Sequence, residues 1–331
     1  MINVALLSRW HVHADDYAHQ IQNIDCLSIK MVWDEDEARG KKWARELSVP
    51  FEQNLQNVLT DRSIDAVVIN TPTNLHKEII VSAAENKKHI FTEKVLAFTV
   101  EDCQEIYQTV DRFNVELMVS LPRLTDDYYV YAQKALDDGL IGELTTIRCR
   151  LAHNGAVAES GKTEGWLPKR FFSEEQTGGG SLIDLGAHPI YLTNRLAGKV
   201  KSLNARMQHI NDLGVDDNAS VLLEYENGAL GIIETSFVSA GSPFQLELYG
   251  TKGTLLVEDH QIRIKSQLLD EDGWTVPDGQ SEALSTPMEQ WVRSIEGKDK
   301  PSIRRSDVLN LSLVNELAKT SDKLGTWMTV D

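Results

Sequence analysis

The sequence predicts two domains: a doubly wound α/β domain over residues 1–122, followed by an α+β domain over residues 123–331 with a large, open, mostly antiparallel sheet. Two observations predict this. Short apolar runs alternate with amphipathic stretches in the first third of the chain, which is typical of a parallel sheet covered by helices. Later segments alternate between apolar and polar residues and are separated by turn signals. At 331 residues and 41% hydrophobic content, the chain can form two cores.

Five apolar runs in the first domain are predicted strands, and the amphipathic stretches between them are predicted helices. The strands are expected over 2–7, 27–33, 66–70, 89–92 and 117–121. The helices are expected over 14–24, 35–47, 76–85 and 100–113. Ligands of such sheets bind beyond the carboxyl ends of the strands, where the strand order reverses. The residues that follow each strand are therefore the candidate site.

The second domain is predicted to build one open sheet. Its strands are expected over 144–151, 200–209, 219–225, 229–237, 245–249, 254–257 and 262–265, with helices over 125–138 and 306–324. An open sheet face that carries Leu, Val, Ile and Phe is commonly covered by another subunit. We therefore expect a homo-oligomer, a dimer or a tetramer, formed through the C-terminal sheet.

Composition excludes several classes of partner and compartment. A net charge of −17 opposes contact with phosphate backbones, so no nucleic-acid partner is expected. No apolar run approaches the roughly 20 residues that span a bilayer, so no membrane association is expected. The amino terminus enters a strand-like segment without a basic leader, and the three cysteines lack disulfide or metal-ligand spacing. These features predict a cytoplasmic protein.

Polar residues follow three of the predicted strands. Asp34 follows the strand over 27–33, where a carboxylate can accept both hydroxyls of an adenosine ribose and repel the extra phosphate of NADP; it can equally cap the next helix, and both interpretations stay open. Asn70, Thr71, Pro72, Asn74 and His76 follow the strand over 66–70 and leave room for a cofactor, although an ordinary loop has a similar composition. Glu93 and Lys94 follow the strand over 89–92, and an amine held in a cleft there can donate or accept a proton.

A second cluster lies after the glycine run at 178–180. Asp184 and His188 are four residues apart, which places them on one face of a predicted helix and points both into one pocket. The glycine run is expected to let a substrate approach closely. Taken alone, Asp184 could equally be a surface carboxylate and His188 a packed histidine.

The order and spacing of these motifs resemble the Gfo/Idh/MocA oxidoreductases, which use a nicotinamide cofactor on sugars, inositols and related polyols. The resemblance covers almost the whole chain and includes 71–76, 93–94, 138–142, 178–188, 216–217 and 249–253. It implies a Rossmann-type first domain and a catalytic group of Lys94, Asp184 and His188. His188 or Lys94 would take the hydroxyl proton while the hydride passes to nicotinamide, and Asp184 would orient the substrate. Asp34 favours NAD over NADP.

Two positions depart from the family pattern. The family usually carries Gly-x-Gly-x-x-Gly after the first strand, and here the loop is Ser8, Arg9, Trp10, His11, Val12 and His13. We still assign residues 8–12 to cofactor binding, because backbone N–H groups, the following helix and the Arg9 charge can hold a phosphate. The second departure is Val95, where the family usually has proline after the Glu-Lys pair.

The expected substrate is a small carbohydrate or polyol. Its predicted contacts, besides the three catalytic residues, are His13, Arg123, Asn154, Trp166 and Arg170. A structural loop would carry such residues as well.

Other interpretations remain open. His11 and His13, with Asp15 and Asp16 close behind, space their side chains as in metal-dependent hydrolases or lyases, although the main prediction assigns no metal. A non-catalytic sugar-binding relative would keep the fold and lose cofactor binding. An enzymatic variant would oxidise its sugar only transiently, so that elimination can follow.

Overall fold

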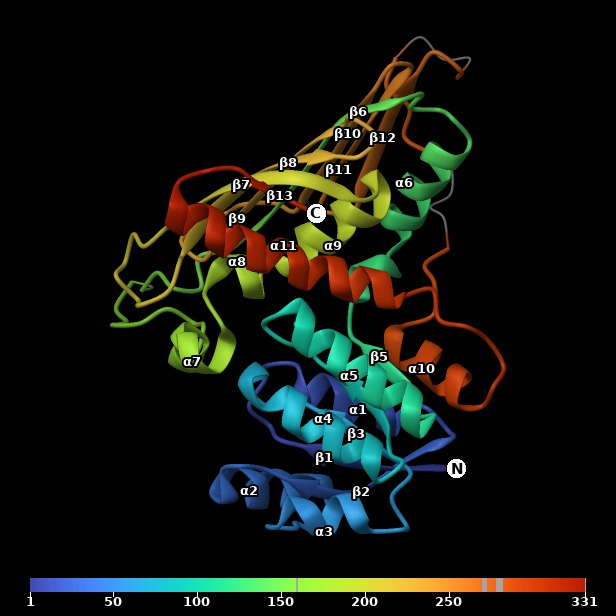
Figure 1. The fold of residues 1–331 in the computed structure, drawn as a ribbon, viewed down its shortest axis with the longest axis vertical. Helices are drawn as coiled ribbons and strands as arrows, with labels where there is room; N and C mark the ends of the chain where they lie inside the picture. Colours follow the sequence, from blue (N-terminus) through green and yellow to red (C-terminus); the bar gives the residue numbers. More distant parts are fainter. Residues whose placement is uncertain (159, 270–272, 278–281, 331) are drawn as a thin grey trace. The chain divides into compact units, whose positions relative to one another are not determined.

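The computed structural model describes residues 1–158, 160–269, 273–277 and 282–330. The chain forms two compact units (Figure 1). Unit 1 consists of Met1–Ser120 and Ser285–Arg304, and unit 2 of Leu121–Leu284 and Arg305–Asp331. The predicted fold class is confirmed: unit 1 is built on a parallel sheet, and unit 2 on a larger, mostly antiparallel one.

Unit 1 is built on a five-stranded parallel sheet. The strands are β1 (Ile2–Leu7), β2 (Leu27–Trp33), β3 (Ala66–Ile69), β4 (His89–Thr92) and β5 (Leu117–Val119). They pair in the order β2-β1-β3-β4-β5, so the strand order reverses between β1 and β3. All four residues of β3 are buried, as expected for a parallel strand covered on both faces. The predicted strands are confirmed to within two residues.

Helices connect the strands of unit 1. They are α1 (Ala14–Gln22), α2 (Glu37–Leu47), α3 (Leu55–Thr60), α4 (His76–Glu85) and α5 (Val100–Phe113). Local capping explains where two of them begin: the Asp36 carboxylate accepts the Arg39 N–H at the start of α2, and Thr99 accepts the Asp102 N–H at the start of α5. α4 and α5 lie side by side (Figure 1). The sequence analysis missed α3 and the 3₁₀ turn Thr73–Leu75.

One late segment lies in unit 1. The helix α10 (Pro287–Ile295) packs against β4 and β5, and its Trp291 is fully buried with its ring 5.6 Å from the ring of Phe91. The sequence analysis placed every residue after 122 in a second domain, whereas residues 285–304 belong to unit 1. The physical reason is the large apolar area of Trp291, which the sheet of unit 1 covers.

Unit 2 is built on an eight-stranded sheet in the order β12-β11-β10-β6-β9-β8-β7-β13. Its strands are β6 (Leu144–Ala152), β7 (Val200–Gln208), β8 (Asn218–Tyr225), β9 (Leu230–Ser236), β10 (Gln245–Gly250), β11 (Gly253–Glu258), β12 (Gln261–Ser266) and β13 (Met328–Thr329). Only β6 and β9 pair in parallel among these strands. The sequence analysis predicted all of them except β13.

Helices α9 (Ala187–Ala197) and α11 (Arg305–Leu324) pack against each other and against this sheet (Figure 1). The remaining elements are α6 (Asp127–Asp137), α7 (Glu174–Thr177), α8 (Ser181–Asp184) and the 3₁₀ turns Pro122–Leu124 and Lys169–Phe172. Leu222, Leu230 and Tyr249 remain more than one-third exposed on strands β8, β9 and β10. None of the described helices is long and apolar enough to cross a membrane.

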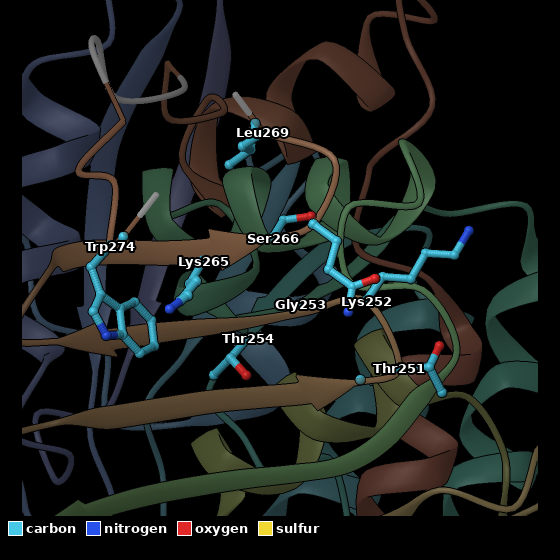
Figure 2. Close-up of a pocket in the computed structure, with 11 residues that line it drawn as sticks. Thr251, Lys252, Gly253, Thr254, Lys265, Ser266, Leu269 and Trp274 are labelled. Carbon is cyan, nitrogen blue, oxygen red and sulfur yellow. The ribbon is translucent and has the colours of Figure 1, made fainter. Parts of the chain in front are cut away.

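A hollow of about 410 Å³ lies beside β11 and β12 in unit 2 (Figure 2). Two amines, Lys252 and Lys265, and the ring of Trp274 line it together with small polar residues and backbone. Its described lining contains no carboxylate or imidazole, so it lacks a pair of groups that could exchange a proton near neutral pH.

Candidate active site

The loop after β1 keeps a glycine-like conformation without glycine. Ser8 is fully buried and has φ +74°, a region that residues with a Cβ enter at a cost of roughly 1 kcal/mol. Its Oγ accepts the N–H of Trp10 at 3.0 Å, which stabilises the turn. Trp10 is 5% exposed, whereas Val12 is exposed. The serine side chain thus closes the turn at the first glycine position of the family pattern.

Asp34 is held by positive and N–H groups from both sides. Its carboxylate accepts the backbone N–H of Arg9 at 2.9 Å and that of Asp36 at 2.8 Å. Arg39 adds a two-point contact, with Nη2 2.6 Å from Oδ1 and Nε 3.0 Å from Oδ2. The Arg9 guanidinium instead binds Asp15 and Glu46. Asp34 does not cap the next helix, because the N-cap residue of α2 is Asp36.

The loop after β3 carries buried polar atoms that lack partners. Both side-chain atoms of Asn70 and the Thr71 hydroxyl are buried and have no hydrogen-bond partner among the described residues. The Asn70 carbonyl accepts the N–H of His11 at 3.1 Å, so the loops after β1 and β3 meet at the point where the strand order reverses. Orphaned polar atoms at this edge fit a polar ligand such as a dinucleotide, because leaving them unsatisfied costs about 1–3 kcal/mol each.

The neighbouring residues differ in exposure. Pro72 is buried and precedes the 3₁₀ turn, whereas Asn74 within that turn is exposed. His76 is buried between carbonyl groups, with Nδ1 3.0 Å from the oxygen of Val95 and Nε2 3.2 Å from that of Thr71. Burial lowers the pKa of His76. The ring therefore ties the Thr71 loop to the segment after Lys94, where the Lys94–Val95 peptide is cis.

Glu93 is the centre of a polar cluster at the end of β4. Its Oε1 lies 2.9 Å from Nδ1 of His13 and 3.4 Å from Nδ1 of His11, and it accepts the Tyr17 hydroxyl at 2.5 Å. The Lys94 N–H donates to Oε2 at 3.2 Å. Tyr17 is also bonded to the Ser120 hydroxyl, 2.9 Å away. The segment from His11 to Tyr17 therefore converges on the Glu93 carboxylate, and Ser120 joins the cluster through Tyr17.

The electrostatics of this cluster follow from its burial. Burial by itself would raise the pKa of the Glu93 carboxyl, but the charges of His11, His13 and Lys94 hold that pKa well below its usual range. Burial opposes the charged form of His13, yet its hydrogen bond to Glu93 raises the pKa of His13 overall. Burial raises the pKa of Tyr17 well above 10, so Tyr17 stays a hydrogen-bond donor. Glu93 is accordingly an ionised acceptor.

The glycine run in unit 2 serves Asp216. The Asp216 carboxylate accepts the N–H of Gly180 at 2.9 Å, the N–H of Leu182 at 2.8 Å and the hydroxyl of Ser181 at 2.8 Å. A Cβ on Gly180 would lie 1.8 Å from the Asp216 carbonyl oxygen. The sequence analysis expected glycine here to let a substrate approach. At Gly180, glycine is instead required because the backbone of Asp216 lies so close.

We expect Gly180→Ala to lower the free energy of unfolding by about 1–3 kcal/mol, because the new methyl group overlaps backbone that must shift. Gly179→Ala is the matched control, since its Cβ would meet side chains and no backbone: Ile183 at 3.2 Å and Oδ1 of Asp216 at 3.7 Å. Urea denaturation of both variants measures the difference. Equal stabilities would contradict the role assigned to Gly180.

Asp184 and His188 do not share one helix, which corrects the sequence analysis. α8 ends at Asp184 and α9 begins at Ala187. Pro189 lacks an N–H and so cannot bond to the carbonyl four residues earlier, which favours an interruption here. Both residues are half-buried.

Tyr191 links His188 to Arg123. The Tyr191 hydroxyl lies 2.7 Å from Nδ1 of His188, and its oxygen accepts the Arg123 N–H at 3.2 Å. Burial raises the pKa of Tyr191, which keeps its proton. The Arg123 side chain donates to the Tyr128 hydroxyl at 3.0 Å and lies over the Phe244 ring. The contact at Nδ1 orients the imidazole of His188.

His153 accompanies Asp184 in unit 2. Burial lowers the pKa of His153, and the negative charge of Asp184 partly opposes that shift. The His153 ring stacks on Phe237 and lies 4.6 Å from the half-exposed ring of Trp166. Asn154 follows it and is half-buried, whereas Arg170 lies over the Phe171 ring.

Sequence reasoning missed several members of these clusters: Tyr17, Arg39, Ser120, His153 and Tyr191. Two of them left a local signal. Tyr17 follows His13 by four residues and Tyr191 follows His188 by three, and both spacings bring side chains together on a helix. Arg39 contacts Asp34, five residues earlier, across the turn from strand to helix, whereas Ser120 depends on a tertiary contact with Tyr17.

A parallel sheet with a reversal between β1 and β3, polar loops at that edge and a lysine at the end of β4 define a dinucleotide-dependent oxidoreductase. Family comparison agrees. The oxidoreductase family with an NAD-binding Rossmann fold matches residues 11–121, and the GFO/IDH/MocA C-terminal domain matches residues 129–256. The chain belongs to the Gfo/Idh/MocA oxidoreductase family.

Three proteins illustrate the similarity. The scyllo-inositol 2-dehydrogenase (NAD(+)) of Bacillus subtilis (strain 168) is 30% identical over 245 residues, which cover 72% of this chain and 68% of the relative. The 2,7-anhydro-N-acetylneuraminate hydratase of Escherichia coli (strain K12) is 27% identical over 240 residues, which cover 71% of this chain and 62% of the relative. A solved levoglucosan dehydrogenase in complex with NADH and levoglucosan has a TM-score of 0.85 at 21% identity, with 99% of each chain covered. The last likeness supports the fold.

Proposed function

We propose that this chain oxidises a hydroxyl group of a cyclic polyol or sugar, or reduces the corresponding ketone, with NAD. The observation that carries the proposal is the Glu93 cluster, which presents the Lys94 backbone at the carboxyl edge of the NAD-binding unit. The names of the inositol and levoglucosan dehydrogenases support this substrate class. Both substrates are rings with secondary hydroxyl groups.

The reaction removes a hydride from carbon and a proton from oxygen. NAD supplies the hydride acceptor. Lys94 or His188 takes the hydroxyl proton, and the ring of His188 is oriented for this by the Tyr191 hydroxyl at Nδ1. Asp184 orients the substrate, with His153 beside it. Further substrate contacts are assigned to His13, Arg123, Asn154, Trp166 and Arg170.

The cofactor is assigned to the two loops that meet at the strand reversal. Asn70 and Thr71 would pair their orphaned polar atoms with it, while Ser8–Val12 would bring backbone N–H groups to its phosphates. Asp34 would accept a ribose hydroxyl in exchange for one of its present donors, which favours NAD over NADP. Pro72, Asn74, His76 and Glu93 complete this assignment.

A fluorescence titration with NADH and NADPH tests the proposal. We expect saturable NADH binding in the micromolar range and weaker NADPH binding. Asn70→Ala should weaken NADH binding about 3- to 10-fold, the worth of one net hydrogen bond, without lowering the stability of the cofactor-free protein. Stability is kept because the removed amide has no partner among the described residues.

The matched control is Asn86→Ala, at the opposite end of α4, which should bind NADH as the wild type does. Turnover is then followed as NADH formation with scyllo-inositol, myo-inositol and levoglucosan. Absence of NADH and NADPH binding would contradict the proposal. So would cofactor binding without hydride transfer to or from any cyclic polyol or sugar.

A second candidate is transient oxidation, in which elimination or hydration follows and no NADH accumulates. The hydratase among the relatives favours it. Product formation without a net change in NADH absorbance would identify this variant.

We also propose that the chain is a cytoplasmic homo-oligomer. The partly exposed Leu222, Leu230 and Tyr249 on strands β8, β9 and β10 support pairing through the large sheet as a dimer or tetramer. None of the three cysteines forms a disulfide among the described residues, which agrees with a reducing compartment.

A further inference from the structure

Three metal-ligand side chains converge at the edge of the sheet in unit 1. His11 lies in the loop after β1, His13 at the start of α1 and Glu93 directly after β4. One potential ligand atom from each lies within 4.8 Å of the other two. The sequence alone offered only the two histidines at this place, with Asp15 and Asp16. The fold replaces those exposed carboxylates with a buried one from a position 80 residues along the chain.

We propose that His11, His13 and Glu93 bind one divalent transition-metal ion of the Zn²⁺ type. Two imidazoles with one carboxylate are a set that Zn²⁺ accepts, whereas Mg²⁺ and Ca²⁺ prefer oxygen ligands throughout. Three protein ligands leave one tetrahedral position for an oxygen atom of water or of a bound molecule. These three residues also belong to the cofactor and substrate contacts of the proposed function, and the metal site goes beyond the proposed hydride transfer, which requires no metal ion.

The spacing of the ligands is close to what the ion requires. Metal–ligand bonds of about 2.0–2.1 Å in a tetrahedron put neighbouring ligand atoms roughly 3.3 Å apart. The distances from Glu93 Oε1 are 2.9 Å to Nδ1 of His13 and 3.4 Å to Nδ1 of His11. The rings of His11 and His13 have their centroids 4.8 Å apart. Small side-chain rotations, together with exchange of the hydrogen bond from the His13 N–H to Nδ1 of His11 (3.2 Å) for the ion, would complete the geometry.

His13 is able to make such a rotation. Its side chain is 43% exposed, and it makes no capping hydrogen bond although it occupies the N-cap of α1. The backbone at His13 is held instead by the turn, since its carbonyl accepts the N–H of Tyr17 at 3.0 Å. Ring movement at His13 leaves the fold of the loop intact.

Groups behind the carboxylate hold it in place. Tyr17 donates to Oε1 of Glu93, the Lys94 N–H donates to Oε2, and Ser120 in turn contacts Tyr17. Hydrogen bonds of this kind orient a ligand before the ion arrives, and their loss typically costs 10- to 100-fold in metal affinity. Glu93 is 2% exposed, and a bound ion would add positive charge beside this buried carboxylate.

Calorimetric titration of the chelator-treated wild type with Zn²⁺ tests the proposal. We expect one ion per chain and no comparable uptake of Mg²⁺. His13→Ala should weaken Zn²⁺ binding at least tenfold, and Co²⁺ bound to the wild type should show the visible absorption of a four-coordinate site that the variant lacks. His19→Ala is the matched control, because His19 is exposed on the same helix outside the cluster and should bind as the wild type does.

Two results would overturn the proposal: no stoichiometric Zn²⁺ uptake by the wild type, or equal affinities of the wild type and His13→Ala. Either result would leave the imidazoles as hydrogen-bond partners of Glu93 only. Circular dichroism of the metal-free variant verifies its fold, and His13→Gln repeats the test if His13→Ala fails to fold. NADH titration of the chelator-treated protein is measured separately, so that loss of the metal site and loss of cofactor binding remain distinguishable.

Discussion

Lys94→Met and His188→Ala are each expected to lower kcat about 10²- to 10⁴-fold, the usual contribution of a positioned proton-transfer group. Lys94→Met keeps the backbone N–H that the Glu93 carboxylate accepts, whereas His188→Ala also removes the contact with the Tyr191 hydroxyl. Initial rates of NADH formation across a range of pH values measure the effect. Removal of the group that takes the proton should also change the slope of the pH profile.

Matched substitutions separate catalysis from fold. Lys30→Met, at an exposed position on β2, and His209→Ala, exposed in unit 2, should keep the wild-type kcat. An effect confined to KM would indicate that the residue binds substrate without exchanging a proton. A variant of Lys94 or His188 with undiminished kcat would remove that residue from the mechanism.

Trp291→Ala is expected to lower the free energy of unfolding of unit 1 by about 3–5 kcal/mol, as large-to-small changes of fully buried aromatic residues do. Trp291 is 0% exposed, contacts Phe91 and donates its Nε1–H to the Glu116 carbonyl at 3.4 Å. The substitution leaves a cavity between α10 and the sheet. Urea denaturation followed by circular dichroism measures the loss.

Trp327→Ala provides the comparison, because Trp327 is 47% exposed and its removal creates no closed cavity. Its free energy of unfolding should stay within about 1 kcal/mol of the wild type. A loss below about 1 kcal/mol for Trp291→Ala would show that α10 contributes little to unit 1. That outcome would restore the simpler division of the chain at residue 122.

The sequence predicted those parts of the fold that local periodicity determines. The strands β1–β5 and the helices α1, α2, α4 and α5 follow from apolar spacing, because burial of one helix face or of a whole strand leaves a pattern in consecutive residues. α10 also left a signal: Thr286 and Glu289 form a capping box around Pro287. Its place in unit 1 was not predictable, since Trp291 and Phe91 are 200 residues apart.

The sequence predicted individual residues of the candidate sites, but not the hydrogen bonds and contacts that join them. Glu93, Lys94 and His13 were recognised at strand and helix ends, but the convergence of His11, His13 and Tyr17 on Glu93 needs the tertiary structure. The same holds for Asp216, which binds Gly180 from 36 residues away. The interruption between Asp184 and His188 had a local cause in Pro189, which helical spacing alone overlooks.

The positive φ of Ser8 bears on how relatives of this chain can be detected. A glycine motif detects residue identity, whereas the turn itself requires only a particular backbone conformation. Here a serine adopts that conformation and bonds its own hydroxyl to the Trp10 N–H. Divergent members of such families are therefore better detected by the backbone dihedral angles of the first loop, and by the hydrogen-bond donors around it, than by the glycine residues of the motif.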